Sequence, residues 1–248
     1  MEMRHAEEPR SEALLVIDDL SVAYGKAGVV NDVSFSVHAG EFVVLLGRNG
    51  AGKSTILHAI SGLIPKAKGR VTFDGHDITS SSPGEIVRAG LVQVLEGHRV
   101  FTHLTVEDNL LVGTYAASPH GDRSKLDNIY SLFPEMAEKR HDLASRLSGG
   151  QQQILAVAQG IIANPRLLIL DEPSGGLAPL VIDRILNVAA SLCQEGTAIL
   201  LIEQLVEKAL RHAHRGLLLE TGRLVGEGSP TELHESGIIQ KIYLGSSH

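Results

Sequence analysis

The sequence predicts an α/β fold with a parallel-sheet core, a peripheral antiparallel β layer and an inserted group of helices. Short β-type runs alternate with helical stretches along the 248-residue chain, as is typical of α/β proteins. The runs "GLVQVL", "RLLILD" and "TAILLIE" are apolar without alternation, which is expected of parallel strands covered on both faces. With 43% hydrophobic residues and 26 glycines, the chain has ample core for one or two domains.

The antiparallel layer and the first buried strand are expected near the start of the chain. Residues 1–12 are polar and acidic, so we expect a flexible N-terminus there. The runs "LLVIDDL", "FSV" and "VTFDG" have the composition of peripheral strands separated by Gly and Asp turns. "FVVLLG" predicts a buried strand, and the helix after it is expected to begin near Gly52.

Helical patterns replace the strand patterns over about 95–150, which predicts a helical subdomain inserted in the α/β core. In "TVEDNLLVG", Thr105 and Asp108 have the spacing of a capping box, and "SKLDNIYSLFPEMAEKR" is helical until Pro134. The final "SPTELHESGIIQKIYLG" predicts two short helices. We therefore expect a single domain over 13–248.

Charge and hydropathy exclude several classes of function. The 22 basic and 29 acidic side chains give a net charge of −7, which argues against general affinity for nucleic acid. No apolar run approaches the roughly 18 residues that a membrane helix needs. The polar start does not resemble a signal peptide. A soluble, cytoplasmic protein is the default expectation.

A phosphate loop is the strongest signal in the sequence. "GRNGAGKS" matches the pattern G-x-x-x-x-G-K-[ST], and it follows a predicted strand and precedes a predicted helix, as the pattern requires. Its backbone N–H groups would surround the β-phosphate of ATP, Lys53 would bridge β- and γ-oxygens, and Ser54 would bind Mg²⁺. The expected nucleotide-binding residues here are Gly47, Arg48, Asn49, Gly50, Ala51, Gly52, Lys53, Ser54 and Thr55.

Two consecutive carboxylates in "LLILDEPS" predict hydrolysis of the bound nucleotide. Asp171 ends an apolar strand, where it could hold the Mg²⁺ shell beside the phosphate loop. Glu172 could orient and deprotonate an attacking water, although it could instead cap the next segment. A kinase is the weaker interpretation, because nothing in the sequence indicates a separate pocket for a molecule that would accept the phosphate.

Two isolated residues are weaker candidates for the same site. Gln93 in "GLVQV" is placed at a strand end, from which its amide could reach Mg²⁺ or the water, but such glutamines are usually solvated. Tyr24 in "SVAYG" could stack on adenine, although an isolated tyrosine is more often packed in the fold.

A second phosphate-binding element is predicted in "RLSGGQQQILAVAQG". Glycines at the start of an apolar helix expose backbone N–H groups at the positive end of the helix dipole. Ser148, Gly149, Gly150 and Gln151 could therefore bind an anion, although the sequence shows only one nucleotide pocket.

Taken together, these motifs resemble the ATP-binding cassette of ABC-type proteins, a P-loop NTPase family. "GRNGAGKS", Gln93, "LSGGQ", "LLILDE" and "SGGLAP" have the order and spacing of that family over nearly the whole chain. The resemblance implies a core lobe, a helical lobe and a head-to-tail dimer with two ATP molecules at its interface. Ser148 to Gln151 would then close over the γ-phosphate held by the partner's phosphate loop.

A narrower resemblance is to the shorter ATPase subunit of branched-chain amino-acid importers. It rests on "QVLEGHRVFTHLTVEDNL", "SGGLAP", "LLIEQ" and "KIYLG", and urea and amide importers share most of these features. Leu95 and His98 depart from the importer pattern where the helical lobe should meet the membrane subunits. Gln204 occupies the place where cassettes generally carry a histidine that contacts the γ-phosphate.

The importer resemblance implies partners that the residues alone do not name. They are a second ATPase subunit, two membrane permeases and, indirectly, a periplasmic solute-binding protein. The resemblance favours a related cassette over an identical copy as the second ATPase subunit. The chain would lie on the cytoplasmic face of the inner membrane, and its sequence does not name the solute. The alternatives are the ATPase of a lipid or polysaccharide exporter, a non-transport ABC protein acting on DNA or ribosomes, and a simple P-loop kinase, which leaves "LSGGQ" unexplained.

Overall fold

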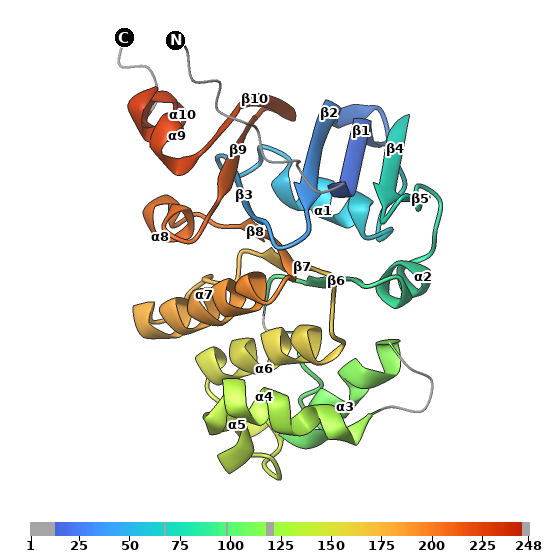
Figure 1. Cartoon of the computed structure of the whole chain (residues 1–248), viewed down its shortest axis with the longest axis vertical. Helices are drawn as coiled ribbons and strands as arrows, with labels where there is room; N and C mark the ends of the chain where they lie inside the picture. Colours follow the sequence, from blue (N-terminus) through green and yellow to red (C-terminus); the bar gives the residue numbers. More distant parts are fainter. Residues whose placement is uncertain (1–12, 67, 98, 118–121, 245–248) are drawn as a thin grey trace, which may run out of the picture.

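The structure is a computed structural model that describes residues 13–66, 68–97, 99–117 and 122–244 (Figure 1). The expected flexible segment 1–12 and His98 both lie outside these residues. No helix in the described ranges is both long enough and apolar enough to cross a membrane.

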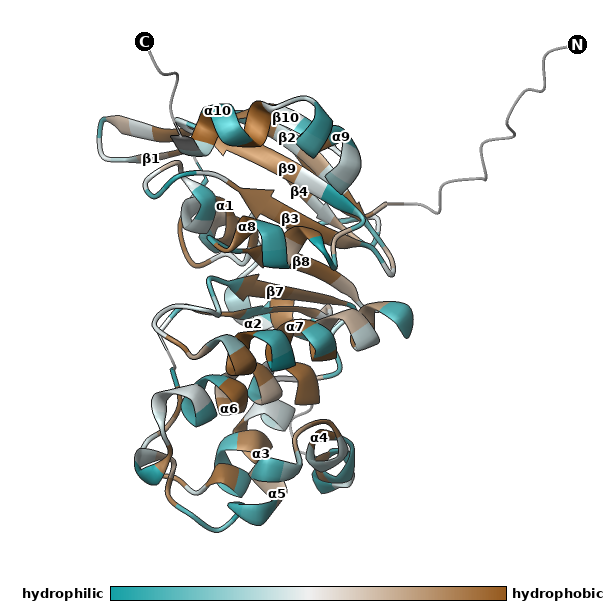
Figure 2. Ribbon diagram, turned by 90° about the vertical axis from the view of Figure 1, so that its left-hand side faces the viewer, coloured by the Kyte–Doolittle hydropathy of each residue, from teal (hydrophilic) through white to brown (hydrophobic). Residues whose placement is uncertain are grey.

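A six-stranded, mostly parallel sheet forms the centre of the molecule. Its order is β10-β9-β3-β8-β7-β6, with only β10 antiparallel to its neighbour. The strands are β3 (Phe42–Leu46), β6 (Leu91–Val94), β7 (Leu167–Asp171), β8 (Ala198–Ile202), β9 (Arg215–Glu220) and β10 (Arg223–Gly228). Every residue of β3, β7 and β8 is buried, and Figure 2 shows them as the most hydrophobic strands. The runs "RLLILD" and "TAILLIE" are therefore confirmed as buried parallel strands, and "GLVQVL" forms the parallel edge strand β6, in which Gln93 is only partly buried.

A separate antiparallel sheet in the order β2-β1-β4-β5 confirms the expected peripheral layer. Its strands are β1 (Ala13–Tyr24), β2 (Ala27–His38), β4 (Lys68–Phe73) and β5 (His76–Asp77). The helix α1 (Lys53–Ile60) lies between the two sheets and shares one hydrophobic core with both (Figure 1). This arrangement fixes the segment between β3 and α1 against two layers of structure.

The opposite face of the parallel sheet is covered by α6 (Gly149–Ile162) and α7 (Pro179–Gln194), which share a second core with the helical lobe. The lobe contains α3 (Val106–Ala117), α4 (Leu126–Leu132) and α5 (Pro134–Glu138), at the bottom of Figure 1. In the part of the chain that the structure describes, no strand lies between the end of β6 at Val94 and the start of β7 at Leu167. The helical region therefore begins where expected but extends past residue 150, because α6 continues to Ile162. The remaining helices are α2 (Pro83–Arg88), α8 (Val206–Leu210), α9 (Pro230–Glu235), α10 (Ile238–Leu244) and the 3₁₀ turns η1 (Arg123–Lys125) and η2 (Ala144–Arg146).

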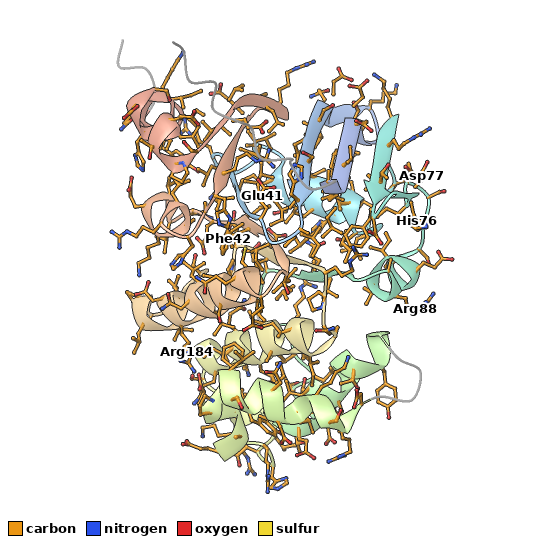
Figure 3. All side chains as sticks on the ribbon, in the orientation of Figure 1. Glu41, Phe42, His76, Asp77, Arg88 and Arg184 are labelled. Carbon is orange, nitrogen blue, oxygen red and sulfur yellow. The ribbon has the colours of Figure 1, made fainter. Side chains whose placement is uncertain are left out.

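Local sequence signals set the helix boundaries in the lobe. The Asp108 N–H donates to Thr105 Oγ1 (3.0 Å), so the predicted cap lies directly before α3. The first helical stretch ends before Pro134, as expected, and Pro134 also begins the short helix α5, which was not predicted. Arg184 of α7, labelled in Figure 3, donates to the Leu132 carbonyl (2.6 Å) and thereby connects the sheet-covering helices with the lobe.

Candidate active site

The phosphate loop connects the carboxyl end of β3 to the first turn of α1. Gly52 is the N-cap of α1 with φ 106°, in the left-handed region that favours glycine. At Gly47 a Cβ atom would lie 2.4 Å from the Leu219 carbonyl oxygen, so the approach of β9 excludes any side chain. The two glycines at the ends of the loop are therefore required by the fold itself.

Lys53 is held inside the loop. Its side chain is buried, and Nζ donates to the carbonyls of Gly47 (3.0 Å) and Arg48 (3.3 Å). The same Nζ lies 3.4 Å from Glu172 Oε1. This ammonium group therefore links the phosphate loop to the carboxylate that follows β7.

Glu172 is contacted through both of its carboxylate oxygens. It follows β7 with φ 45°, and its N–H donates to the Ile202 carbonyl of β8 (3.0 Å). Oε1 faces Lys53, whereas Oε2 accepts a 2.6 Å hydrogen bond from Gln204 Nε2. The structure thus brings together three residues that lie far apart in the sequence.

Asp171 and Ser54 form the adjoining pair. Ser54 Oγ donates to Asp171 Oδ1 (3.0 Å), and His58 Nε2 lies 3.7 Å from Oδ2. Burial raises the pKa of the Asp171 carboxyl; the Ser54 hydrogen bond opposes this shift, whereas the negative charges of Glu172 and Glu96 add to it. The buried carboxylate therefore lies where a nearby cation would stabilise its charged form.

The oxygen donors of Ser54 and Asp171 are of the kind that Mg²⁺ prefers. Among the residues described, no group of three or more His, Cys, Asp or Glu side chains could hold a metal ion on its own. A magnesium ion between Ser54 and Asp171 would therefore complete its coordination with phosphate oxygens and water.

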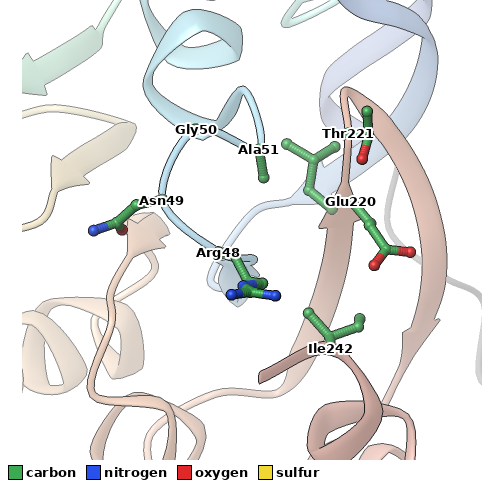
Figure 4. Close-up of a pocket in the computed structure, with 8 residues that line it drawn as sticks. Arg48, Asn49, Gly50, Ala51, Glu220, Thr221 and Ile242 are labelled. Carbon is green, nitrogen blue, oxygen red and sulfur yellow. The ribbon is translucent and has the colours of Figure 1, made fainter. Parts of the chain in front are cut away.

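An open pocket of about 380 Å³ unites six of the nine predicted phosphate-loop residues. It is lined by Val29, Asn49, Gly50, Gly52, Lys53, Ser54, Thr55, Glu96, Glu172 and Gln204. Arg48 and Ala51 instead line a second cavity, of about 340 Å³, which also contacts Asn49 and Gly50 (Figure 4). The phosphate loop thus separates two spaces, and only the first contains both Lys53 and Glu172.

Gln93, which the sequence predicts to reach Mg²⁺ or the water, does not line this pocket. In the register of the parallel sheet it pairs with Ile169, two residues before Asp171, and is therefore roughly 7 Å short of the sheet's carboxyl edge. Neither amide atom of its side chain has a hydrogen-bond partner among the described residues. Glu96, beyond the end of β6, lines the pocket instead.

Tyr24 is placed at the exposed end of the β1–β2 hairpin, with 53% of its surface accessible. It does not line the pocket, but Val29, shortly after the hairpin turn, does. An exposed ring at this position remains available to a nucleotide base.

Ser148 to Gln151 begin α6, away from the chain's own phosphate loop. The Gln151 N–H donates to Ser148 Oγ (3.3 Å), and the Ser148 N–H donates to Gln151 Oε1 (3.1 Å). Neither side chain nor the glycines between them line the pocket of Lys53. The helices α6 and α1 pack on opposite faces of the parallel sheet, so the two predicted phosphate-binding elements lie apart within this chain.

Three residues of this region lie in motifs quoted above but were not predicted to have a role. Besides Glu96, they are Glu203 and Tyr243. The buried Glu203 Oε2 accepts from Ser174 Oγ (2.8 Å) and from the N–H of Gln204 (2.8 Å), so it fixes the backbone that presents Gln204. The hydroxyl of Tyr243 contacts the backbone of Gly47. The one available signal for Glu203 was its place directly before Gln204 in "LLIEQ".

Comparison with known proteins shows the family of the chain. The family model described as "ABC transporter" matches residues 30–175, which include the phosphate loop, Ser148 and both carboxylates. The chain belongs to the ABC transporter family. As an ABC transporter ATPase, it binds nucleotide and couples hydrolysis of ATP to transport.

Two curated relatives of this ABC ATPase cover nearly the whole chain. The high-affinity branched-chain amino acid transport ATP-binding protein BraG of Pseudomonas aeruginosa is 38% identical over 94% of this chain and 100% of BraG. The lipopolysaccharide export system ATP-binding protein LptB of Escherichia coli is 30% identical over 94% of this chain and 98% of LptB. A solved nucleotide-free ATP-binding cassette from an ABC transporter has a TM-score of 0.83 at 25% identity, covering 94% of this chain and 100% of that cassette.

Proposed function

We propose that this ABC ATPase drives the import of branched-chain amino acids. The observation that carries the proposal is the 38% identity to BraG over the full length of that protein. In this proposal the chain pairs head to tail with a second, related cassette on the cytoplasmic face of the inner membrane. The pair acts on two membrane permease subunits, which receive the solute from a periplasmic binding protein.

Hydrolysis would begin with an exchange of partners at Lys53. Before nucleotide binds, the ammonium contacts the Gly47 and Arg48 carbonyls and Glu172. ATP offers phosphate oxygens that form stronger, charge-assisted hydrogen bonds than carbonyls do. When Lys53 turns to the phosphates, the Glu172 carboxylate loses its counter-charge and becomes free to accept a proton from water.

Ser54 and Asp171 would hold Mg²⁺, whose chemistry in this site is to neutralise charge on the β- and γ-phosphate oxygens. Glu96, just beyond the end of β6, lines the same pocket. Its carboxylate adds a further negative charge beside Asp171, and we assign it to the hydration shell of the site.

Gln204 would orient the general base, since it donates to Glu172 Oε2 and cannot itself take a proton. We expect Gln204→Ala to lower kcat about 10- to 100-fold, the rate equivalent of one hydrogen bond to a charged group, with little change in ATP affinity. Gln204→His should retain turnover, because an imidazole N–H can replace the amide donor. Steady-state ATPase assays of the assembled complex measure both variants. Parental turnover in the alanine variant would contradict the role.

Ser148 would act on the nucleotide of the partner subunit. In the pair, each composite site would combine the phosphate loop of one cassette with the LSGGQ-type segment of the other. We expect a covalently linked pair with Ser148→Arg in this chain and the phosphate-loop lysine of the partner cassette replaced by alanine to keep about half of the parental ATPase activity, because one composite site then contains neither lesion. The matched control places Ser148→Arg and Lys53→Ala together in this chain, which leaves a lesion in each composite site and should abolish activity. The opposite pattern would show that Ser148 serves its own chain's nucleotide.

Export is the second candidate, because LptB, a lipopolysaccharide export ATPase by name, is 30% identical over nearly its full length. The two candidates differ in what stimulates the ATPase. We would copurify the chain with the permeases encoded beside it, reconstitute the complex in liposomes, and measure ATP hydrolysis and uptake of labelled leucine with the cognate binding protein. Stimulation and uptake support import. A complex stimulated by lipopolysaccharide but not by leucine would replace that proposal with export.

A further inference from the structure

The last helix of the chain contacts the first residue of the phosphate loop. The Gly47 N–H donates to Tyr243 Oη (2.9 Å), and the Tyr243 hydroxyl lies 3.3 Å from the Gly47 carbonyl, to which it can donate. The two residues are 196 positions apart in the sequence. A single side chain of α10 thus contacts both polar groups of one loop residue.

Elsewhere α10 packs into the hydrophobic core through Ile239 and Ile242, but it leaves a cavity beside the loop. A cavity of about 340 Å³ separates Ile242 from the loop residues Arg48 to Ala51 and from the end of β9 (Figure 4). Because this side of the loop is open, continuous packing does not hold it there. The hydroxyl of Tyr243 connects α10 to the loop by hydrogen bonds. It is protonated at neutral pH, as tyrosine ordinarily is, and burial raises its pKa further.

The Gly47 carbonyl is also an acceptor for Lys53 Nζ, at 3.0 Å. When Lys53 turns to ATP, this carbonyl loses one of its two donors. Tyr243 can still donate to it and continues to accept from the Gly47 N–H, so neither buried polar group is left without a partner.

We propose that Tyr243 is a positioning residue that holds Gly47, and with it the phosphate loop, in the conformation that binds ATP. The inference rests on the proposal that Lys53 exchanges its contacts with Gly47 for the phosphates of ATP. Without the hydroxyl, the Gly47 carbonyl depends on Lys53 alone, so releasing Lys53 to ATP becomes less favourable.

The test is Tyr243→Phe in the full chain, which removes only the hydroxyl. The matched control is Tyr130→Phe, because Tyr130 also donates through its hydroxyl, to Glu107 Oε2 (3.3 Å), but within the helical lobe. We expect the Kd of ATP by calorimetry to rise about 3- to 10-fold in Tyr243→Phe, as for the loss of a neutral hydrogen bond, and KM to rise with it. The kcat should stay within about 2-fold of the parent, and Tyr130→Phe should leave Kd and KM unchanged.

Lys53→Ala is measured alongside, to separate the two proposals. If Lys53→Ala binds ATP like the parent, the phosphate-loop mechanism fails, and the inference fails with it. If Lys53→Ala loses binding while Tyr243→Phe keeps the parental Kd, the role of Tyr243 alone is wrong. A lowered melting temperature and lowered kcat at unchanged KM would also overturn it, because that pattern reports a purely structural contact.

Discussion

Replacing Lys53 by alanine is expected to raise the Kd of ATP by at least about 100-fold, which abolishes binding under ordinary assay conditions. The ammonium would form charge-assisted hydrogen bonds to β- and γ-phosphate oxygens, and two such bonds account for a loss of this size. In the free protein the same group is buried between the Gly47 carbonyl and Glu172, so its removal also leaves Glu172 without a counter-charge. Isothermal calorimetry with ATP and Mg²⁺ measures the effect.

A second substitution separates charge from packing at this buried position. Lys53→Met keeps most of the aliphatic stem and removes only the ammonium, so it should lose binding to the same degree as alanine. Lys139→Ala is the control, because its exposed ammonium pairs with Asp142 in the helical lobe. Retained affinity in the methionine variant would mean that Lys53 supports the loop by packing and not by contacting phosphate.

Much of the fold could be predicted because its signals are local. The apolar runs of β7 and β8, the glycines around Lys53 and the cap at Thr105 each depend on a few neighbouring residues. Local spacing also placed Asp171 and Glu172 at a strand end, where the structure has them.

The features that could not be predicted depend on register and on contacts between distant segments. The pairing of β6 with β7 sets Gln93 beside Ile169, and Glu96, beyond the end of β6, lines the pocket. No local pattern shows how far two parallel strands are offset, so Glu96 could not be identified as a pocket residue. The hairpin of β9 and β10 was likewise not predicted, although Thr221 and Gly222 occupy its turn between two short β-type runs.

Tyr243 shows the same limit. In the sequence it is one residue of a short predicted helix, and no motif near it indicates a contact with the phosphate loop. Its contact with Gly47 arises because β9, α9 and α10 bring the end of the chain back to the edge where β3 ends. Such long-range contacts could not be predicted from local patterns, because they depend on the order of the strands in the folded sheet.

The substitution Glu172→Gln should slow turnover by roughly 10²- to 10⁴-fold, the usual contribution of a general base. Glutamine keeps the size of the side chain and a carbonyl oxygen that can accept from Gln204 Nε2, but an amide cannot take a proton from water. Glu195→Gln, an equal change of charge at the exposed end of α7, is the control and should leave turnover unchanged.

Nucleotide affinity distinguishes this mechanism from general damage to the site. In the free protein Glu172 Oε1 competes with phosphate for Lys53 Nζ at 3.4 Å, and the uncharged amide of the variant would compete less. ATP affinity should therefore be retained or increased in Glu172→Gln, while single-turnover hydrolysis is slow. Because hydrolysis would normally release the head-to-tail dimer, this variant should accumulate as an ATP-bound pair when its authentic partner cassette is present. Size-exclusion chromatography with ATP measures that pair; a variant that hydrolyses ATP at the parental rate would show that another group takes the proton.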